Sequence, residues 1–367
     1  MSTVAIDGTY VLDPQPSGVS VYSRRLIESL AELDSPHRFL ICYRLSRWKR
    51  RNRSVPVSPP GRAPQVVTCF FQEPWTFWLA KRAELFHSLA QRPAPFHFPK
   101  EIVTVHDVFP LASRDYSTPE FQRKFSDLLI EAGKRAVRVI TPSRYTAQQL
   151  SQHAGVAEEK IRVIPEGVDL PGRLLPPEAR LRAREERVGR GNELVLVVGV
   201  IQNRKNTLGA LRALARLPER YRMVLAGGNG YGSEAVHDFI ARSGLGKRVA
   251  VLGHVEPSAL FMLYQTASVL LFPSFEEGFG LPVLEGLAHG LPVVASNTAS
   301  LPEVGGEAAL YTDPNDEAQI AAQVLRAAED DGLRESMIAA GKARVKEFSW
   351  KKAAQRTLEV YAEVLRS

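Results

Sequence analysis

The chain has 367 residues, of which 44% are hydrophobic and 24% are charged. These proportions are ordinary for a folded protein and exclude a disordered, collagenous or fibrous chain. The length predicts two domains, each able to bury a sizeable core. The two cysteines, Cys42 and Cys69, exclude a disulfide scaffold and a cysteine-based zinc cluster.

Lys and Arg number 47 against 40 Asp and Glu, a net charge of +7. Between Asp34 and Glu73 there is no acid, and the bases there include Arg44 to Arg53 with Trp48 among them. Such a patch attracts phosphates on an anionic membrane, a phosphorylated substrate or a nucleic acid. No nucleic-acid motif accompanies it, so we expect no nucleic-acid partner. The alternative is a solvated basic loop.

No apolar run approaches the ~18 residues that span a bilayer. The first residues lack a basic segment and carry Asp7 in their apolar run, unlike a signal peptide. We therefore expect a cytoplasmic protein.

Short β-rich runs alternate with helical periodicity along the first half. The predicted strands are Thr3–Ile6, Phe39–Tyr43, Ile102–Val105, Arg138–Ile140 and Ile161–Ile164, and the predicted helices are Val19–Leu33 and Tyr145–His153. Residues 170–192 are rich in Pro, Arg, Glu and Gly and lack an apolar face, which indicates a linker.

The second half restarts with a continuously apolar strand, typical of a parallel strand buried on both faces. The predicted strands are Leu194–Val198, Arg222–Ala226, Val249–Leu252, Val269–Phe272 and Val293–Ala295, and the predicted helices are Leu208–Leu217, Glu234–Ser243, Pro257–Ala267 and Pro282–His289. This alternation predicts an α/β protein with two doubly wound, Rossmann-like domains, 1–169 and 193–345, facing across a cleft. Residues 346–367 form an amphipathic helix that we expect to close back on the first domain.

The segment from Leu271 to Ser296 carries the most chemical information. A buried strand ends at Phe272, a glycine loop follows, and Pro282 suits the first turn of a helix. Backbone amides in such a loop hold phosphate oxygens, and the helix dipole favours them. The loop residues expected at the donor are Gly278, Phe279, Gly280 and Leu281.

Two glutamates flank this loop. Glu285 lies about one turn into the helix, where its carboxylate suits a ribose diol, and Glu277 lies at the mouth of the loop, where it suits a sugar hydroxyl or a developing positive charge. The alternative is a tight strand-to-helix turn without a ligand.

Arg204 and Lys205 follow the strand that ends near Gly199, and two cations at the carboxyl end of a parallel strand suit a diphosphate. Gly227 and Gly228 follow another strand and allow a nucleotide to approach, but the dinucleotide pattern Gly-x-Gly-x-x-Gly fails because Ser233 stands at its third position.

In the first half, Gly18 begins a helix and suits a phosphate or the transferred sugar, and His106 ends a strand that points at the predicted cleft. A packed or exposed histidine is the alternative for His106. The chain has no Asp-x-Asp motif and no metal-ligand spacing among its histidines, so we expect no metal and no cofactor.

These motifs resemble glycosyltransferase family 4, retaining enzymes of the GT-B fold. The resemblance rests on segments in the family's order, which read EIVTVHD (101–107), VITPSRYTAQQL to VIPEGVD (139–169), GVIQNRKN (199–206), EEGFGLPVLEGLAHGLPVVAS (276–296), SLPEVGGEAALYTDP (300–314) and FSWKKAAQRTLEVYAEV (348–364). Many members carry Arg directly after the glycine of the third segment, where Val200 stands here, so the resemblance assigns that role to Arg204.

The resemblance implies transfer of a hexose-type sugar from a GDP-, UDP- or ADP-linked donor to an acceptor hydroxyl, with retention, in glycoconjugate synthesis. It places the donor on the second domain, with Glu277 toward the sugar, Glu285 toward the ribose, and Arg204 and Lys205 on the diphosphate. The acceptor, a sugar or lipid-linked sugar, belongs to the first domain. The resemblance also assigns Gly18 to the glycine loop of that domain and His106 to the histidine near the sugar. The alternatives are a nucleotide-sugar epimerase, a phosphorylase, a non-catalytic nucleotide-sugar-binding module and a nicotinamide oxidoreductase.

Two further expectations concern specificity and location. Val255 and the neighbouring backbone are candidates for reading the nucleotide base. We hypothesise that the basic residues 44–53 and nearby aromatic residues dock on an anionic membrane with a lipid-linked acceptor. Those aromatic residues are Phe70, Phe71, Trp75, Phe77 and Trp78.

Overall fold

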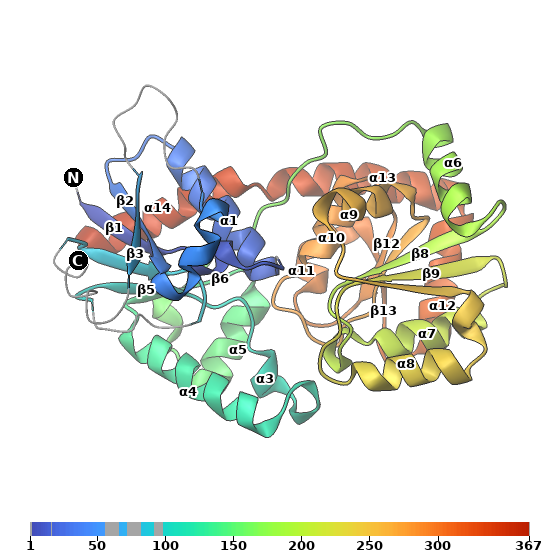
Figure 1. Cartoon of the computed structure of the whole chain (residues 1–367), viewed down its shortest axis with the longest axis horizontal. Coiled ribbons are helices and arrows are strands. Elements are labelled where there is room, and N and C mark those ends of the chain that lie inside the picture. The colour runs from blue at the N-terminus through green and yellow to red at the C-terminus, as the bar shows by residue number, and fades with distance from the viewer. Residues whose placement is uncertain (1, 16, 56–65, 72–81, 92–97, 367) are drawn as a thin grey trace. The chain divides into compact units, whose positions relative to one another are not determined.

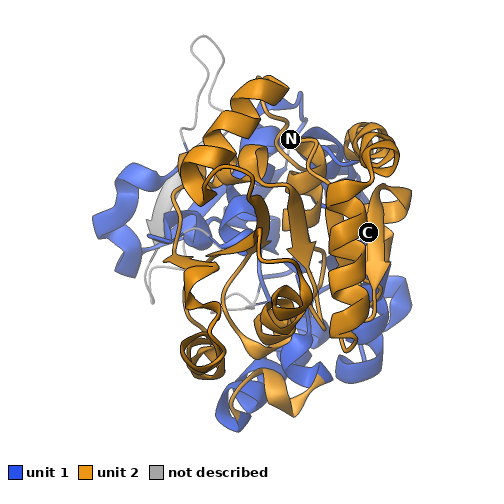
Figure 2. Ribbon diagram, turned by 90° about the vertical axis from the view of Figure 1, so that its right-hand side faces the viewer, with its two compact units in different colours: residues 1–112, 119–167, 348–367 blue, residues 113–118, 168–347 orange. Residues whose placement is uncertain are grey.

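The computed structural model describes residues 2–15, 17–55, 66–71, 82–91 and 98–366. The chain divides into two compact units, coloured separately in Figure 2: residues 1–112, 119–167 and 348–367 form the first, and residues 113–118 and 168–347 form the second. Each unit contains one parallel sheet with helices packed against it (Figure 1). The predicted fold class, two Rossmann-like α/β domains, is confirmed.

The first unit has a seven-stranded parallel sheet in the order β3-β2-β1-β4-β5-β6-β7. Its strands are β1 (Thr3–Asp7), β2 (Arg38–Arg44), β3 (Val66–Phe71), β4 (Leu85–Ser88), β5 (Glu101–Thr104), β6 (Arg138–Thr141) and β7 (Ile161–Val163). Its helices are α1 (Gly18–Glu32), α3 (Phe109–Ala112), α4 (Pro119–Arg135), α5 (Arg144–Ala154) and α14 (Trp350–Arg366), with the 3-10 turns η1 (Thr9–Leu12), η2 (Leu45–Arg53) and η4 (Glu158–Lys160).

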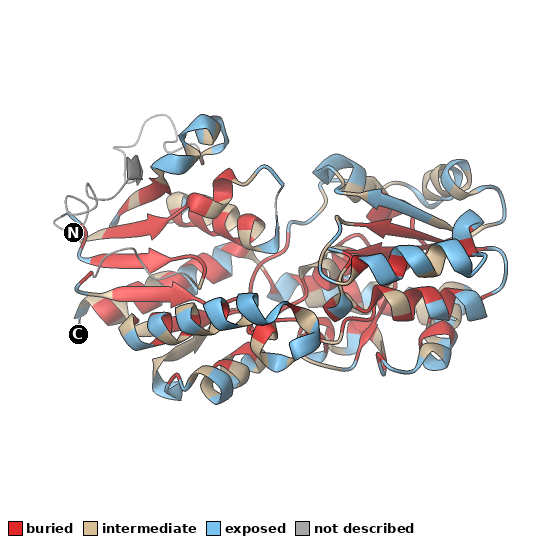
Figure 3. Ribbon diagram, turned by 60° about the horizontal axis from the view of Figure 1, so that its bottom comes forward, coloured by how far each residue is buried: buried red, intermediate tan, exposed pale blue. Residues whose placement is uncertain are grey.

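Helices cover both faces of this sheet. Neighbouring residues of one strand point to opposite faces, so they contact different helices. Val103 of β5 packs in a cluster with Phe125 of α4 and Leu150 of α5. The next residue, Thr104, shares a hydrogen bond of 3.2 Å with Tyr22 of α1. The strands between the two helical layers are buried, as Figure 3 shows.

The second unit has a six-stranded parallel sheet in the order β10-β9-β8-β11-β12-β13. Its strands are β8 (Glu193–Val198), β9 (Tyr221–Ala226), β10 (Val249–Gly253), β11 (Val269–Phe272), β12 (Val293–Ser296) and β13 (Ala309–Thr312). Its helices are α6 (Pro177–Val188), α7 (Thr207–Arg216), α8 (Ser233–Arg242), α9 (Pro257–Thr266), α10 (Leu281–Ala288), α11 (Leu301–Gly305), α12 (Glu317–Glu329) and α13 (Asp331–Arg344), with the 3-10 turns η3 (Arg114–Tyr116), η5 (Asn203–Lys205), η6 (Leu245–Lys247), η7 (Gly306–Ala308) and η8 (Val345–Glu347).

The stretch predicted as a linker, residues 170–192, contains helix α6 and belongs to the second unit. This helix has no buried residue, which is why no apolar pattern marked it. Arginines attach it instead: Arg180 donates to the His289 carbonyl at 3.1 Å, and Arg184 donates to the Thr266 carbonyl at 3.2 Å. Residues 113–118, inside the predicted first domain, also pack with the second unit.

The last helix, α14, packs on α1 in the first unit, as expected. Tyr361 is fully buried and its hydroxyl lies 2.7 Å from Nδ1 of His87. Burial, together with the nearby His106, lowers the pKa of His87 to about 3, so this ring is neutral. At the edge of the helix, Glu363 accepts from Arg138 and Arg162, each at 2.6 Å.

Within the described ranges, none of the helices combines the length and the apolar character that a membrane span needs. Trp75, Phe77, Trp78 and Arg62 lie outside the described residues, as do the side chains of Phe70 and Phe71.

Candidate functional site

Two neighbouring strands of the second sheet bring three of the predicted site residues together. Strands β8 and β11 pair directly, so their carboxyl ends share one edge of the sheet. Arg204 and Lys205 lie in η5 after β8, and Glu277 lies in the loop after β11. The turn after η5 is fixed by Asn206, whose side-chain amide donates to the Pro273 and Pro314 carbonyls at 3.1 and 2.7 Å.

Glu277 lies between the two cations. Its Oε1 is 2.5 Å from Nζ of Lys205, and its Oε2 is 3.0 Å from Nη1 of Arg204. Glu277 and Arg204 are 6% and 8% exposed. Burial raises the pKa of Glu277, but the charges of Lys205 and Arg204 outweigh it, and the pKa is lowered overall. The site therefore holds a buried carboxylate and a buried guanidinium, with the half-buried ammonium of Lys205 beside them.

The loop that carries Glu277 is held by hydrogen bonds from both sides. The Phe275 amide donates to the Arg204 carbonyl at 2.9 Å, and Arg204 Nη1 donates to the Glu276 carbonyl at 2.7 Å. The hydroxyl of Ser300, fully buried, lies 2.9 Å from the Glu277 carbonyl and 2.8 Å from the Phe279 carbonyl. Arg204 is therefore both a charge in the site and a support for its loop.

The glycine loop ends directly at helix α10, as predicted. Gly280 is its N-cap with φ of 107°, and a Cβ there would lie 2.7 Å from the Leu301 side chain, so only glycine fits. Phe279 is buried and Leu281 is the first helical residue. The turn, with Gly278 two residues before the cap, places the first amides of α10 at the loop that carries Glu277.

The loops after β8 and β9 lie in direct contact. A Cβ on Gly227 would fall 1.9 Å from the Gly199 carbonyl oxygen, whereas a Cβ on Gly228 would meet nothing within 4 Å. Gly199 has φ of 130° and lies beside the Lys205 side chain. Of the predicted donor glycines, Gly227 therefore has a packing role, while Gly228 borders open space.

Glu285 is half-buried in α10, and its Oε2 accepts from the Tyr264 hydroxyl at 2.6 Å. The pKa of Glu285 is raised overall. Burial raises it, the hydrogen bond from Tyr264 lowers it, and the nearby charge of Asp169 raises it further. The Tyr264 ring stacks on His289 with centroids 5.2 Å apart. Val255, the candidate for the base, is half-buried between β10 and α9.

His106 and Gly18 both belong to the first unit. Nδ1 of His106 lies 3.0 Å from Glu166 Oε1, and Nε2 lies 2.9 Å from the Leu89 carbonyl oxygen. Both partners accept hydrogen bonds, which favours the doubly protonated ring. Burial lowers the pKa of His106, but the hydrogen bond and charge of Glu166 outweigh it, so the pKa is raised. Gly18 is exposed and begins α1 after the Ser17 N-cap.

Sequence reasoning missed three residues that hold these side chains: Glu166, Tyr264 and Ser300. Glu166 had a usable signal, because it follows β7 as His106 follows β5, and parallel strands end at one edge. In the described part of the chain, no three His, Cys, Asp or Glu side chains are grouped to hold a metal ion.

Two family models cover most of the chain. Glycosyltransferase Family 4 matches residues 16–171, and glycosyl transferases group 1 matches residues 181–344. O-antigen chain mannosyltransferase B of Escherichia coli is 30% identical over 273 residues, which are 73% of this chain and 71% of that protein. The chain belongs to glycosyltransferase family 4. It therefore acts as a glycosyltransferase in glycoconjugate synthesis, and nothing in these matches favours the epimerase or the binding module.

Solved structures show the same fold at low identity. Sucrose-phosphate synthase of Thermosynechococcus elongatus superposes with a TM-score of 0.77 at 20% identity, over 100% of both chains. HepE of Anabaena in complex with UDP-glucose superposes with a TM-score of 0.76 at 18% identity, over 99% of this chain and 100% of that one. This glycosyltransferase thus has the two-domain GT-B fold. Its chain spans only 34% of the length of another relative, the serotype-specific mannosyltransferase WbdA of Escherichia coli.

Proposed function

We propose that the second unit binds a nucleoside-diphosphate sugar and that Arg204 and Lys205 hold its diphosphate. The observation that carries this proposal is that the buried Arg204 and Glu277 and the half-buried Lys205 are grouped beside the N-terminus of α10. One carboxylate offsets only one of these two cations. A diphosphate supplies further negative charge, and the amides at Phe279–Leu281 supply neutral donors for its oxygens.

Bond cleavage concentrates negative charge on the leaving diphosphate. Fixed cations and amides stabilise that charge most in a buried site, where little water screens them. Lys205 is the mobile point charge, and its Nζ also lies 4.8 Å from the centre of the Phe272 ring. With two cations in place, the leaving group needs no metal, so we propose a metal-independent reaction.

The transferred sugar gains positive character at its anomeric carbon as the bond breaks. In this proposal Glu277 faces the sugar, Glu285 binds the ribose, and His106 contacts the sugar from the first unit. The leaving phosphate accepts the proton of the acceptor hydroxyl, which gives retention without a covalent enzyme intermediate. Gly18, Gly199, Gly228 and Val255 complete the expected donor contacts.

The relatives support a hexose donor. O-antigen chain mannosyltransferase B is named for mannose, and HepE was solved with UDP-glucose. We propose a hexose linked to GDP, UDP or ADP, and a sugar or lipid-linked sugar as acceptor.

A thermal-shift panel of nucleoside diphosphates and their sugars, with and without chelator, tests the donor. A ligand at 100 times its dissociation constant stabilises the fold by about 2.7 kcal/mol. We expect one diphosphate to raise the melting temperature equally in both conditions, and Lys205→Ala to abolish the rise. The matched control is Lys247→Ala, an exposed lysine of the same unit. The anomeric configuration of the product, read by NMR, tests retention.

Two outcomes overturn parts of the proposal. If a free sugar or a nicotinamide shifts the melt and no nucleoside diphosphate does, donor binding is wrong. If the shift and the turnover vanish with chelator and return with Mg²⁺, metal independence is wrong while donor binding stands.

We also propose that η2 contacts an anionic membrane. Trp48 is 47% exposed and Leu45 is 39% exposed, and η2 has no acidic residue. Part of the basic run is committed elsewhere, since Arg47 pairs with Asp13 and Arg51 lies over the Trp48 ring. Lys49, which is exposed, remains for lipid headgroups.

Flotation with phosphatidylglycerol vesicles at low salt tests this contact. We expect binding that falls with added salt and falls further in a Trp48→Ala, Lys49→Gln variant. The matched control is Lys247→Gln, which removes the same charge from the second unit. No flotation at low salt overturns the membrane contact and leaves the donor proposal untouched.

A further inference from the structure

A polar pocket of about 330 Å³ lies in the first unit, at the carboxyl ends of β1 and β2. It is lined by seven residues, and each of them carries a polar side chain. Asp7 and Arg44 are the last residues of the two strands, and Tyr10 and Asp13 follow β1. The volume lies at the lower end of the range for small-molecule sites. The polar groups on all of its lining residues indicate a small polar ligand.

Two of the four charged side chains in the pocket form an ion pair with each other. Nη2 of Arg47 lies 3.5 Å from Oδ1 of Asp13. The same wall is fixed by Arg53, whose Nη1 donates to the Asp13 and Pro14 carbonyls at 3.1 and 3.0 Å. These contacts hold η2 against the chain that leads into α1. Two arginines of the basic run, Arg47 and Arg53, therefore build one wall of the pocket.

The other two charged side chains are positioned but not paired with each other. Asp7 is 5% exposed, and its Oδ1 accepts from the backbone amide and hydroxyl of Thr9 at 3.0 and 2.5 Å. The Thr9 hydroxyl also accepts from the Arg44 amide at 3.3 Å, so it links the Arg44 backbone to the Asp7 carboxylate. Among the described residues, the Arg44 guanidinium has no hydrogen bond or ion pair.

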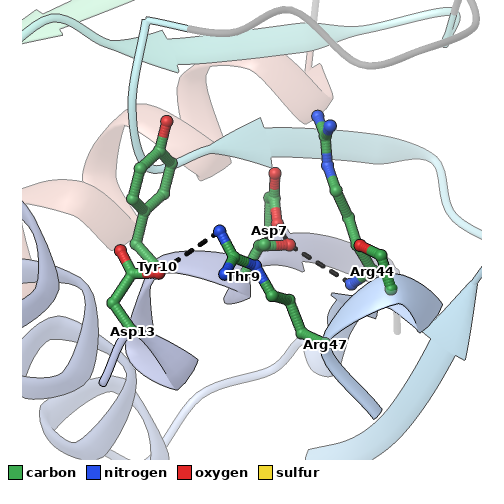
Figure 4. Close-up of a pocket in the computed structure, with 7 residues that line it drawn as sticks. Asp7, Thr9, Tyr10, Asp13, Arg44 and Arg47 are labelled. Carbon is green, nitrogen blue, oxygen red and sulfur yellow. Dashed lines mark hydrogen bonds and ion pairs between the residues drawn. The ribbon is translucent and has the colours of Figure 1, made fainter. Parts of the chain in front are cut away.

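The close-up in Figure 4 shows what this leaves open. The side chains of Tyr10 and Arg44 extend to the same side of the pocket, with Asp7 between them, and the pair of Arg47 and Asp13 lies to the other side. A guanidinium offers several donors in a planar fork that matches a phosphate or carboxylate. A carboxylate accepts hydrogen bonds from hydroxyl groups. A ligand that satisfies both must carry an anion and hydroxyls a short distance apart.

We propose that this pocket binds the acceptor of the transfer as a sugar bearing a phosphate, with Arg44 on the phosphate and Asp7 on a sugar hydroxyl. Identification of this ligand as the acceptor rests on the proposed function. Arg44 then determines specificity, because an uncharged sugar leaves its guanidinium without a counter-charge. The phosphate can come from a free sugar phosphate or from the headgroup of a phosphoinositide lipid, and both present the same chemistry.

The test measures binding to the full chain by calorimetry. The probes are glucose 6-phosphate, mannose 6-phosphate, glucose, inorganic phosphate and vesicles that contain phosphatidylinositol. We expect either a sugar phosphate or the phosphatidylinositol vesicles to bind. The probe that binds shows whether the phosphate comes from a free sugar phosphate or from a lipid headgroup. Arg44→Gln weakens that binding by about tenfold or more, as loss of a charged hydrogen bond does, and Arg44→Lys gives an intermediate loss.

The matched control is Arg38→Gln, because Arg38 is an exposed arginine at the opposite end of the same strand. Circular dichroism shows whether each variant folds. The inference is overturned if Arg44→Gln binds as the wild type does, if glucose binds as tightly as its phosphate, or if inorganic phosphate alone matches the sugar phosphate. Nucleoside-diphosphate binding is measured on the same samples. If the diphosphate binds and no sugar phosphate or lipid does, the pocket inference fails; if the diphosphate itself fails to bind, the proposed function fails.

Discussion

Both units place a buried glutamate at the carboxyl edge of a parallel sheet, and the two glutamates have different partners. Glu277 in the second unit contacts Lys205 and Arg204, which stay charged over the whole physiological range. Glu166 in the first unit contacts His106, whose charge depends on pH. The same architecture therefore gives a fixed charge arrangement in one unit and a titratable one in the other. The difference follows from the partner and not from the backbone.

Removing Lys205 breaks the fixed arrangement and gives the largest expected effect. Lys205→Ala lowers kcat by about 10²–10³-fold, the usual cost of losing one donor to a developing charge. Initial rates with the donor found in the thermal-shift panel measure it, and Lys247→Ala is the control. A loss smaller than about tenfold contradicts a role for Lys205 at the diphosphate.

Glu166→Gln removes the charge that keeps His106 protonated. Because the folded-state pKa of His106 is raised, the pair stabilises the fold below the unfolded value of about 6.5 and loses this stabilisation as pH rises through the folded value. We expect the free energy of unfolding to fall by about 1–3 kcal/mol near pH 6 and by less near pH 9. Urea denaturation at both pH values measures it.

The control for this variant is His153→Gln, an exposed histidine on α5. Equal losses at the two pH values show that Glu166 acts through packing alone and that the first unit holds no titratable pair.

Glu285 sharpens the comparison because it is half-buried and its carboxylate contacts a tyrosine hydroxyl in place of a cation. Tyr264→Phe removes the hydrogen bond that opposes the raised pKa of Glu285, so the pKa rises further. A raised carboxylate pKa destabilises the fold at higher pH, and we expect a loss of about 1 kcal/mol near pH 7 that shrinks near pH 5. Urea denaturation measures it against Tyr231→Phe, an exposed tyrosine. An unchanged stability at both pH values refutes the role of this hydrogen bond.

The grouping of Arg204, Lys205 and Glu277 was predictable, because each follows an apolar strand and parallel strands end at one edge. The strand order that makes β8 and β11 neighbours was not, since it depends on packing between distant segments. The partners Glu166 and Tyr264 were missed for the same reason. His106 and Glu166 lie 60 residues apart in sequence, and only the fold brings them within 3.0 Å.

The missed elements divide into two kinds. Strand β4 has four residues and includes the fully buried His87, so it carries no readable apolar run. Helices α4 and α12 had a signal that the sequence reading did not use. In α12, Ile320, Ala321, Val324 and Ala327 are buried at helical spacing. Strand β4 was missed for a physical reason, because the polar His87 takes a core position that an apolar residue would usually fill. Helices α4 and α12 could have been predicted from their apolar spacing.

The return of α14 to the first unit determines the order in which the protein is completed during synthesis. Residues 168–347 leave the ribosome before residues 348–367, so the second unit has its full sequence first. Until Trp350 and Tyr361 emerge, Tyr22 of α1 and His87 of β4 lack the partners that these residues supply. The first unit therefore completes its packing only when α14 has been made, although its strands are made first.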